Sequence, residues 1–515
     1  MTDAIVGLDI GTTQTKAVVI ATDGTVLAQA GREATLVSLR PNWAEQDADE
    51  WWRNTQEILQ ELTAAVRGRA TIRAVGVSGM VPALVVLGGD GRPLRRSIQQ
   101  NDARTASEIA ELKGAFGDER FFALTGGSIN QQVLAPKLRW LAKHEPDVLE
   151  RARWLCGSYD YVVYRLTGDL WAEHNWALES GLCDIASGDW SPELVELAGI
   201  APDLLPAIRA SHEVVGEVRP DAAEATGLAA GTPVIAGVAD HVASAFTATV
   251  TQPGDLLVKF GGAGDVLYSL ERLVTDPRLF IDHHVVPGAY YLNGCMATSG
   301  SLVKWFTREF CQADAPAAAS AGVGVYAYLD GLAAPLPPGS DGLIVLPYFL
   351  GEKTPLHDPY ARGTIVGLGL HHGRHHIFRA VLEAVAYGFR HHVDVLAERD
   401  LPVRRVLASD GGAASDLWLQ LTADVLGRPV HRVLGHPGSS LGAAFVAGKA
   451  VGLFDGWGDI ERFVVAADPF EPQAASHAAY QDFYALFRDT YERLASLYPR
   501  LVQARDAAEI GRAAS

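Results

Sequence analysis

Short apolar runs separated by turn residues mark the beginning of the chain. The runs at 4–10, 15–21 and 24–31 predict three β-strands, and TDGT (22–25) predicts the tight turn between the last two. The turn between the first two strands is rich in Gly and Thr. The chain is therefore expected to open with an antiparallel meander.

The apolar spacing then changes to that of a helix. Within residues 47–66, Trp52, Ile58, Leu59 and Leu62 recur at helical intervals, and acidic residues occupy the first turn. This pattern predicts an amphipathic helix. Strand and helix patterns continue to alternate up to about residue 245, which favours an α/β fold.

The opening theme returns in the second half of the chain. DLLVKFGGAGDVLYSL (255–270) is again a strand, a Gly-rich turn and a strand. The repeat predicts two lobes, 1–245 and 246–515, with the two turns facing one cleft. The Ala/Pro/Gly-rich run at 312–340 predicts a short helix followed by an exposed loop, and the last 40 residues predict an aromatic-striped helix packed on the second lobe.

Composition narrows the classes of partner. The chain has 515 residues and a net charge of −18, which disfavours nucleic acid or an anionic membrane as a partner. No apolar stretch reaches the roughly 20 residues of a membrane helix. The N-terminal residues lack the pattern of an export signal, and the four cysteines form no Cys-x-x-Cys pair, so a cytoplasmic location is expected.

The first Gly/Thr turn is a candidate phosphate site. Gly11, Thr12 and Thr13 offer backbone N–H groups and hydroxyls, but Lys16 is followed by a strand, so the stretch is not a P-loop. Asp9, at the end of the preceding strand, suits such a site if Mg²⁺ lies between its carboxylate and the phosphate. The alternative is an ordinary hairpin turn with an aspartate in local hydrogen bonds.

Two later segments are further candidates. In VIAGVADHVASAFTA (234–248), a buried strand is followed by Asp240 at a predicted helix start, where the alternative is an N-cap aspartate. In VLASDGGAASDLWLQLTADVLG (406–427), a Gly-Gly turn leads into a helix and could approach a nucleotide. Such turns are common in α/β proteins, so the second signal is weak by itself.

Taken together, these segments resemble the FGGY family of carbohydrate kinases, in its xylulokinase-like branch. The similarity runs in order along nearly the whole chain. Its motifs include GLDIGTTQTK, NWAEQDADEWW, QQNDART, APKLRWLAKHEP, VIAGVADHVASA, LPYFLGEKTPLHDPYARG, SDGGAASDLWLQLTADVLGRPV and SSLGAA. The resemblance implies a duplicated α/β fold of two ribonuclease-H-like lobes of the actin/hexokinase type around a central cleft.

The resemblance also implies roles for individual residues. Asp240 would be the catalytic base beside the sugar, and Asp9 would organise Mg²⁺ through water. The residues implied to hold ATP are Thr12, Thr13, Lys16, Gly261, Gly262, Gly411, Gly412, Ala413 and Ser415. Those implied to lie at the sugar are Val81, Pro82, Asn101, Asp102 and Asp240, with Arg104 in the same segment. A homodimer is a further expectation from the family.

Departures from the family pattern leave the acceptor open. Val81 and Pro82 replace the Met-His of xylulokinases, Gln100 replaces a Trp, and Asp410 replaces the first Gly of the adenosine turn. D-xylulose is the first candidate acceptor, with D-xylulose 5-phosphate as product. Alternative acceptors are another pentulose, a deoxy-sugar or a tetritol such as erythritol. Alternative functions of a different class are an actin- or chaperone-like nucleotide switch and a non-catalytic sugar sensor.

Overall fold

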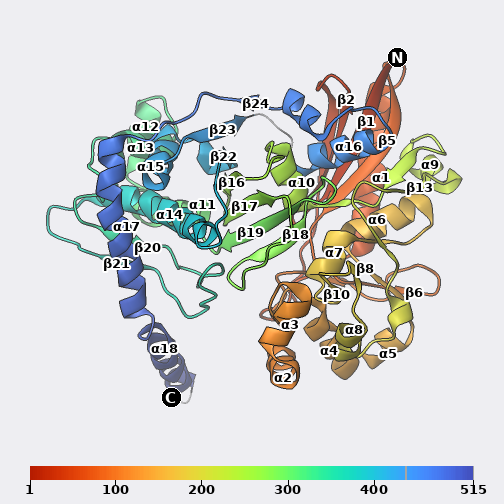
Figure 1. Ribbon diagram of the computed structural model, residues 1–515, viewed down its shortest axis with the longest axis horizontal. Helices are drawn as coiled ribbons and strands as arrows, with labels where there is room; N and C mark the ends of the chain where they lie inside the picture. Colours follow the sequence, from red (N-terminus) through yellow and green to blue (C-terminus); the bar gives the residue numbers. More distant parts are fainter. Residues whose placement is uncertain (435–437, 514–515) are drawn as a thin grey trace. The chain divides into compact units, whose positions relative to one another are not determined.

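The computed structural model describes residues 1–434 and 438–513, which form two compact units (Figure 1). The first unit combines Met1–Thr251, Glu271–Tyr291 and Gly435–Val465, and the second combines Gln252–Leu270, Leu292–Leu434 and Ala466–Ser515. Each unit is therefore assembled from separate stretches of the chain. The two-lobe boundary near residue 245 stays a prediction about domains.

A mixed sheet forms the centre of the first unit. Its strand order is β13-β14-β5-β1-β2-β3, and β15 pairs with β5 beside β14. The strands are β1 (Thr2–Ile10), β2 (Gln14–Ala21), β3 (Val26–Glu33), β5 (Ala70–Gly79), β13 (Val214–Glu217), β14 (Pro233–Ile235) and β15 (Val238–Ala239). The antiparallel meander predicted for the start of the chain is confirmed as β1, β2 and β3.

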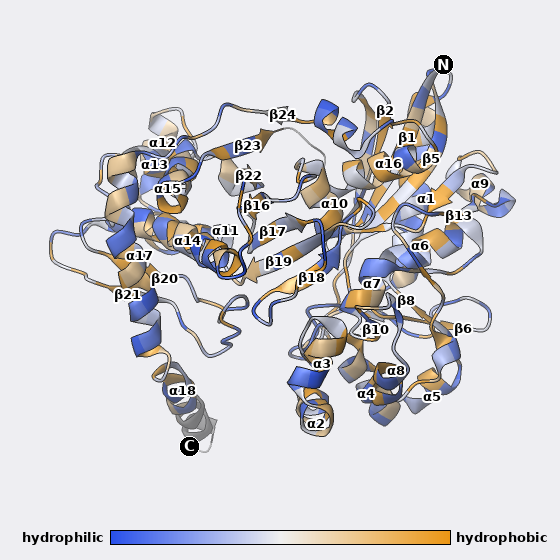
Figure 2. Ribbon diagram, in the orientation of Figure 1, coloured by the Kyte–Doolittle hydropathy of each residue, from blue (hydrophilic) through white to orange (hydrophobic). Residues whose placement is uncertain are grey.

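Helices cover both faces of this sheet. Successive strand residues point to opposite faces, and Gly76 of β5 faces α16 (Ser439–Ala450), whereas Gly79 faces Ser158 of α6 (Ser158–Thr167). Hydrophobic residues dominate β1 and β5 (Figure 2), and their side chains are almost all buried. The unit is thus a sheet between helical layers.

Two glycines allow α16 to lie very close to the sheet. A Cβ on Gly7 would lie 1.9 Å from the carbonyl oxygen of Ser440, and one on Gly76 would lie 2.0 Å from that of Ala443. The helix itself presents small residues, mainly Ala and Gly. This close packing brings the start of α16 to the end of β1.

The predicted helix at 47–66 is confirmed as α1 (Ala48–Val66), which packs against β2 and β3. Asp47 caps it by accepting a hydrogen bond from the Asp49 N–H at 3.0 Å.

Further helices of the unit are α2 (Ala106–Phe116), α3 (Asp118–Thr125), α4 (Leu134–His144), α5 (Pro146–Glu150), α7 (His174–Glu179), α8 (Pro192–Ala198), α9 (Pro220–Thr226) and α10 (Asp240–Thr247).

The second unit repeats the strand-turn-strand theme. Its sheet contains β19 (Tyr290–Met296), β17 (Gly264–Leu270), β16 (Asp255–Lys259), β22 (Arg405–Ser409) and β23 (Val430–Leu434), in this order. Its helices include α11 (Gly300–Phe310), α14 (Arg374–Ala397), α15 (Asp416–Leu426), α17 (Ala474–Leu494) and α18 (Tyr498–Ala513). The aromatic-striped helix predicted near the end is α17, which packs on α15.

The expectation of one helix and an exposed loop at 312–340 is wrong. The segment forms two helices, α12 (Asp314–Ser320) and α13 (Val325–Ala333), separated by a turn at Gly322. Leu329 and Ala333 are buried because α13 packs against α14. Tertiary packing therefore stabilises a helix that the Gly/Pro-rich composition had argued against.

Among the described residues, no helix combines the length and the apolar character needed to cross a membrane.

Candidate functional site

Three parallel strands of the first unit end at the same edge of the sheet. Asp9 of β1 lies opposite Ser78 of β5, and Val238–Ala239 of β15 pair with Ser78 and Gly79. Asp240 follows β15 directly and begins α10. Because the carboxyl ends of neighbouring parallel strands form one edge, the sheet brings Asp9 and Asp240 together from positions 231 residues apart in the sequence.

Asp9 lies in a part-buried, negatively charged environment. Burial, followed by the charge of Asp240, raises the pKa of Asp9 from 3.8 to about 6, while hydrogen bonds from Ser439 and Ser78 and the charge of Lys16 oppose the rise. The Ser78 hydroxyl lies 3.3 Å from Asp9 Oδ1. A cation placed here would relieve the repulsion between the two carboxylates.

The turn after Asp9 presents free backbone donors. The Gly11 N–H bonds the Gln14 carbonyl at 3.1 Å, and the Thr12 carbonyl accepts the Gln46 side-chain amide at 2.8 Å. No acceptor within residues 1–434 and 438–513 takes the N–H of Thr12 or Thr13. Two adjacent unused N–H groups form a concavity suited to phosphate oxygens.

Asp240 does not serve as an N-cap. The N-cap position of α10 is Ala239, and Asp240 is the first helical residue. Its Oδ1 accepts the backbone N–H of His241 at 2.7 Å, while no group of the described chain donates to Oδ2. The carboxylate therefore keeps one oxygen available for a ligand.

A histidine and two carboxylates adjoin Asp240. The His241 Nε2 atom lies 3.1 Å from Asp282 Oδ2 and 3.8 Å from Glu179 Oε1. Asp282 comes from β18 (Phe280–His283) and Glu179 from the last residue of α7. Sequence reasoning missed this cluster, since only the His next to Asp240 was visible as a hint and its two partners lie far away in the chain.

The two apolar residues implied at the sugar lie at the same edge. Val81 and Pro82 follow β5, and the Met80 N–H just before them bonds the Ile10 carbonyl of β1 at 3.2 Å. Both side chains are buried and offer no hydrogen-bonding group. This segment can shape a pocket but cannot donate to a sugar hydroxyl through these side chains.

Asn101 and Asp102 lie in very different surroundings. Asn101 is exposed, whereas Asp102 is completely buried. Asp102 Oδ2 accepts the Ala44 N–H at 2.6 Å and Arg104 Nη2 at 2.7 Å, and Oδ1 accepts Arg104 Nε at 2.8 Å. Both carboxylate oxygens are thus already occupied, and a direct contact between Asp102 and a sugar stays a prediction.

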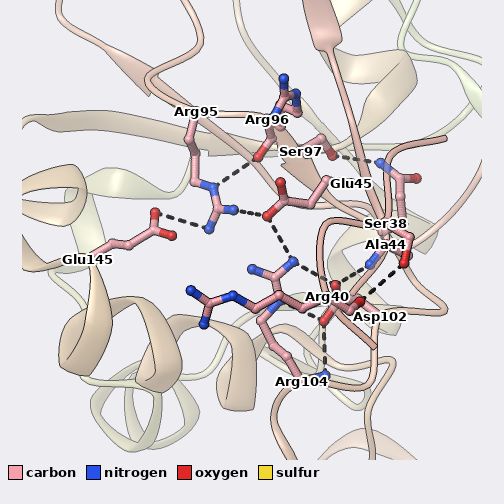
Figure 3. A network of polar contacts seen from close by, with 11 residues as sticks. Ser38, Arg40, Ala44, Glu45, Arg95, Arg96, Ser97, Asp102, Arg104 and Glu145 are labelled. Carbon is pink, nitrogen blue, oxygen red and sulfur yellow. Dashed lines mark hydrogen bonds and ion pairs between the residues drawn. The ribbon is translucent and has the colours of Figure 1, made fainter. Parts of the chain in front are cut away.

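Asp102 belongs to a buried network of charges (Figure 3). Arg104 bridges Asp102 and Glu45, with 2.8 Å between Arg104 Nη2 and Glu45 Oε1, and Arg95 also bonds Glu45 and pairs with Glu145. Glu45 precedes Gln46 on the short strand β4 (Glu45–Gln46). Because Gln46 holds the Thr12 carbonyl, the network also supports the first phosphate turn.

The nucleotide candidates of the second unit also come together. The Phe260 N–H bonds the Ser409 carbonyl and the Gly412 N–H bonds the Phe260 carbonyl, each at 3.0 Å, so the Gly261–Gly262 turn adjoins the turn at Gly411. Gly411, Gly412 and Ala413 lie in a short 3₁₀ helix, and Ser415 caps α15 through the Trp418 N–H at 3.0 Å.

The second turn resembles the first in its free donors. The Gly261 and Gly262 carbonyls accept the backbone N–H groups of Gly300 and Ser299 at 2.7 and 2.9 Å, at the start of α11. The N–H groups of Gly261 and Gly262 have no acceptor in the part of the chain that the structure describes. Each unit therefore carries a candidate phosphate turn at the end of a strand.

Comparison with known proteins identifies the family. The model for the N-terminal domain of the FGGY family of carbohydrate kinases matches residues 4–247, and that for its C-terminal domain matches residues 273–451. The crystal structure of xylulose kinase from Rhodospirillum rubrum is 44% identical, with a TM-score of 0.92 over 96% of this chain and 99% of that one.

Two sequence relatives extend the comparison. Xylulose kinase from Bacillus subtilis is 29% identical over 95% of this chain and 96% of its own length. Glycerol kinase from Nocardia farcinica is 32% identical over 91% of this chain and 94% of its own length. The predicted two-lobe actin/hexokinase-type α/β fold is confirmed by the similarity to the Rhodospirillum structure. The chain belongs to the FGGY family of carbohydrate kinases and is an ATP-dependent sugar kinase.

Proposed function

We propose that this kinase phosphorylates a small ketose, with D-xylulose as acceptor and D-xylulose 5-phosphate as product. The observation that carries the proposal is Asp240, with one free carboxylate oxygen, at the strand edge that also holds Asp9 and the Thr12–Thr13 turn. The names of the Rhodospirillum and Bacillus relatives support the choice of acceptor.

In this mechanism Asp240 accepts the proton of the attacking hydroxyl through Oδ2. The transition state of phosphoryl transfer is loose, so alignment and charge stabilisation contribute most of the catalysis, and a weak carboxylate base suffices. The free N–H groups of Thr12 and Thr13 bind phosphate oxygens, and Lys16 adds positive charge near Asp9. Gly261, Gly262, Gly411, Gly412, Ala413 and Ser415 are assigned to the nucleotide.

The donor groups at Asp9 fit a Mg²⁺ ion. Mg²⁺ prefers carboxylate oxygen and retained water, and Asp9 would offer such an oxygen next to the charge of Asp240. When bound, the ion neutralises charge on the transferring phosphate. Asp9 orients it, through water in this proposal.

Nucleotide binding should depend on the ionisation of Asp9. We expect the affinity for ADP with Mg²⁺ to rise as the pH passes about 6, and this step to vanish in Asp9→Asn. Titration calorimetry at several pH values measures both proteins, so the variant also corrects for titration of the nucleotide. An identical pH dependence in the two proteins would contradict the assignment.

The raised pKa of Asp9 also predicts that the stability of the ligand-free protein depends on pH. A carboxyl whose pKa is raised on folding contributes stability below its unfolded pKa and loses this contribution as the pH rises through its folded pKa. The wild type should therefore lose stability relative to Asp9→Asn between about pH 4 and about pH 6. Thermal unfolding over this range measures the difference.

A polyol is the second candidate acceptor. Val81 and Pro82 are buried and apolar where xylulokinases carry Met-His, and the Nocardia relative is a glycerol kinase. A pocket that lacks particular hydrogen-bonding groups selects among hydroxyl patterns differently. Glycerol and tetritols such as erythritol therefore belong in the substrate panel beside other pentuloses.

The test is ADP release measured across pentuloses, hexuloses and alditols, with Asp240→Asn as control and the product identified by NMR. D-xylulose should give the highest kcat/KM, and the phosphate should reside on O5. A higher kcat/KM for another acceptor would overturn the choice of D-xylulose. ADP release that is independent of every acceptor would instead favour a nucleotide switch.

A further inference from the structure

His241 lies between the candidate base and a second carboxylate. Its Nδ1 atom is 3.5 Å from Asp240 Oδ1, and its Nε2 atom is 3.1 Å from Asp282 Oδ2. Glu179 approaches the same Nε2 atom at 3.8 Å. The ring therefore faces a carboxylate oxygen with each of its two nitrogens.

This geometry favours a charged ring. A neutral imidazole has one N–H and one lone pair, so one nitrogen would direct its lone pair at a carboxylate oxygen. An imidazolium has two N–H groups and can donate toward Asp240 and toward Asp282. The doubly protonated form therefore suits the positions of both carboxylates.

The electrostatic surroundings agree with this protonation state. Burial by itself would lower the pKa of His241, but the charge of Asp282 and the hydrogen bonds that the carboxylates of Asp240 and Asp282 accept from the ring hold this pKa well above its ordinary value. Burial and then the charge of Asp282 raise the pKa of Glu179 well above its ordinary range. The titratable groups around the ring are Asp240, Glu179 and Asp282, with Asp9 beyond Asp240 and Glu173 beyond Glu179.

The contact restricts Asp240 at one oxygen only. Asp240 Oδ1 receives the backbone N–H of His241 at 2.7 Å and lies beside Nδ1 of the same residue. A carboxylate oxygen that accepts one hydrogen bond and faces the ring of the same residue has a restricted orientation, and the direction of the other oxygen is restricted with it. Oδ2 is the atom that takes the proton in the proposed mechanism.

We infer that His241, charged and anchored by Asp282, is a positioning residue that fixes Asp240 so that Oδ2 meets the acceptor hydroxyl. The inference rests on the proposed function, because it assigns His241 to the base of that reaction. Glu179 completes the anchor on the Nε2 side. No atom is transferred through the ring, whose two protons stay in place.

Two variants distinguish the contribution of the Nδ1 side of the His241 ring from that of the Nε2 side. Asn at position 241 can place an amide N–H where Nδ1 was, and Gln can place one where Nε2 was. We expect His241→Asn to keep kcat within about 10-fold of wild type and His241→Gln to lower it about 10²-fold, since a small misplacement of a reacting group has effects of that order. KM for the sugar and the affinity for ATP should change little in either.

Equal losses of kcat in the two variants, or losses confined to KM, would overturn the positioning role. Thermal unfolding of both proteins shows whether either has simply lost its fold. The two failures are distinct: with no phosphate transfer by the wild type the proposed function fails, and with normal transfer by His241→Gln only the positioning role fails.

A spectroscopic measurement examines the ring without any substrate. In protein labelled with ¹⁵N-histidine, the His241 signals, assigned by their loss in His241→Asn, should report protons on both ring nitrogens at neutral pH. Asp282→Asn should convert them to a neutral tautomer. A neutral ring in the wild type would contradict the inference.

The same three side chains could instead ligate a metal ion, because their candidate ligand atoms all lie within 4.8 Å of one another. In that case Nε2 would offer a lone pair and could not donate to Asp282. Elemental analysis of the purified protein should find no zinc or other transition metal that Glu179→Gln removes. One equivalent of such a metal would overturn the inference.

Discussion

Asp240→Asn should lower kcat for sugar phosphorylation by about 10²–10⁴-fold, the range that a positioned general base contributes. Asn keeps the size of the side chain and a hydrogen-bond acceptor toward the His241 N–H, but it cannot take a proton. ATP binding should persist, since the nucleotide candidates of the second unit are untouched. ADP release with saturating sugar and calorimetric titration of ATP measure the two properties.

Asp221→Asn is a matched control for this substitution. Asp221 also lies in the first turn of a short helix of the first unit, but its carboxylate is largely exposed and pairs with Arg219. Its replacement should leave kcat and KM unchanged. Turnover by Asp240→Asn close to that of the control would show that Asp240 is not the base.

Arg104→Met should destabilise the protein by about 3–5 kcal/mol, the range found when one partner of a buried ion pair is removed. Arg104 is the shared partner of Asp102 and Glu45, and its side chain is only 1% exposed. It also stacks 3.7 Å from the ring centre of Trp43. Met retains much of the apolar volume, so the effect reports mainly on two buried carboxylates that lose their cation. Urea unfolding provides the measurement.

An exposed arginine provides a control for the buried Arg104. Arg32 also bridges two acids, Glu57 and Glu61 at 3.0 and 2.8 Å, but in exposed surroundings. Exposed ion pairs contribute little, so Arg32→Met should cost several-fold less than Arg104→Met. Adding Asp102→Asn and Glu45→Gln to Arg104→Met should recover part of the loss. Equal effects at the two arginines would contradict a role for burial.

Arg104→Met should also affect the candidate phosphate turn at Thr12. Glu45 adjoins Gln46, which bonds the Thr12 carbonyl, so a loosened network should also weaken nucleotide binding. The kinetic signature is a raised KM for ATP in Arg104→Met under conditions where the protein is still folded. An unchanged KM would limit the network to a structural role.

Local sequence patterns were sufficient to predict many helices and strands, and also the candidate site residues at the ends of the strands. The alternation that predicted β1, β2 and β3 and the spacing that predicted α1 depend on near neighbours in the chain, so they can be read directly. The same holds for Asp9, the Gly/Thr turn and Asp240, because each lies at the end of a strand. Parallel pairing of β1, β5 and β15 then brings these candidates to one edge.

The helices at 314–333 show where local patterns fail. Gly and Pro in this segment argue for a loop, since their helix propensity is poor. Burial of Leu329 and Ala333 against α14 outweighs that propensity. Packing partners decide such segments, and they are distant in sequence.

By itself, therefore, the sequence determined the family, the opening meander of β1, β2 and β3, and the candidate residues at the ends of β1, β5 and β15. Only the tertiary structure decided what surrounds them: the burial of Asp102 under Arg104 and the enclosure of His241 by Asp282 and Glu179. The physical reason is that burial and charge pairing depend on distances in space. Asp282 lies 41 residues after His241 and Glu179 lies 62 residues before it, and no local pattern records such encounters.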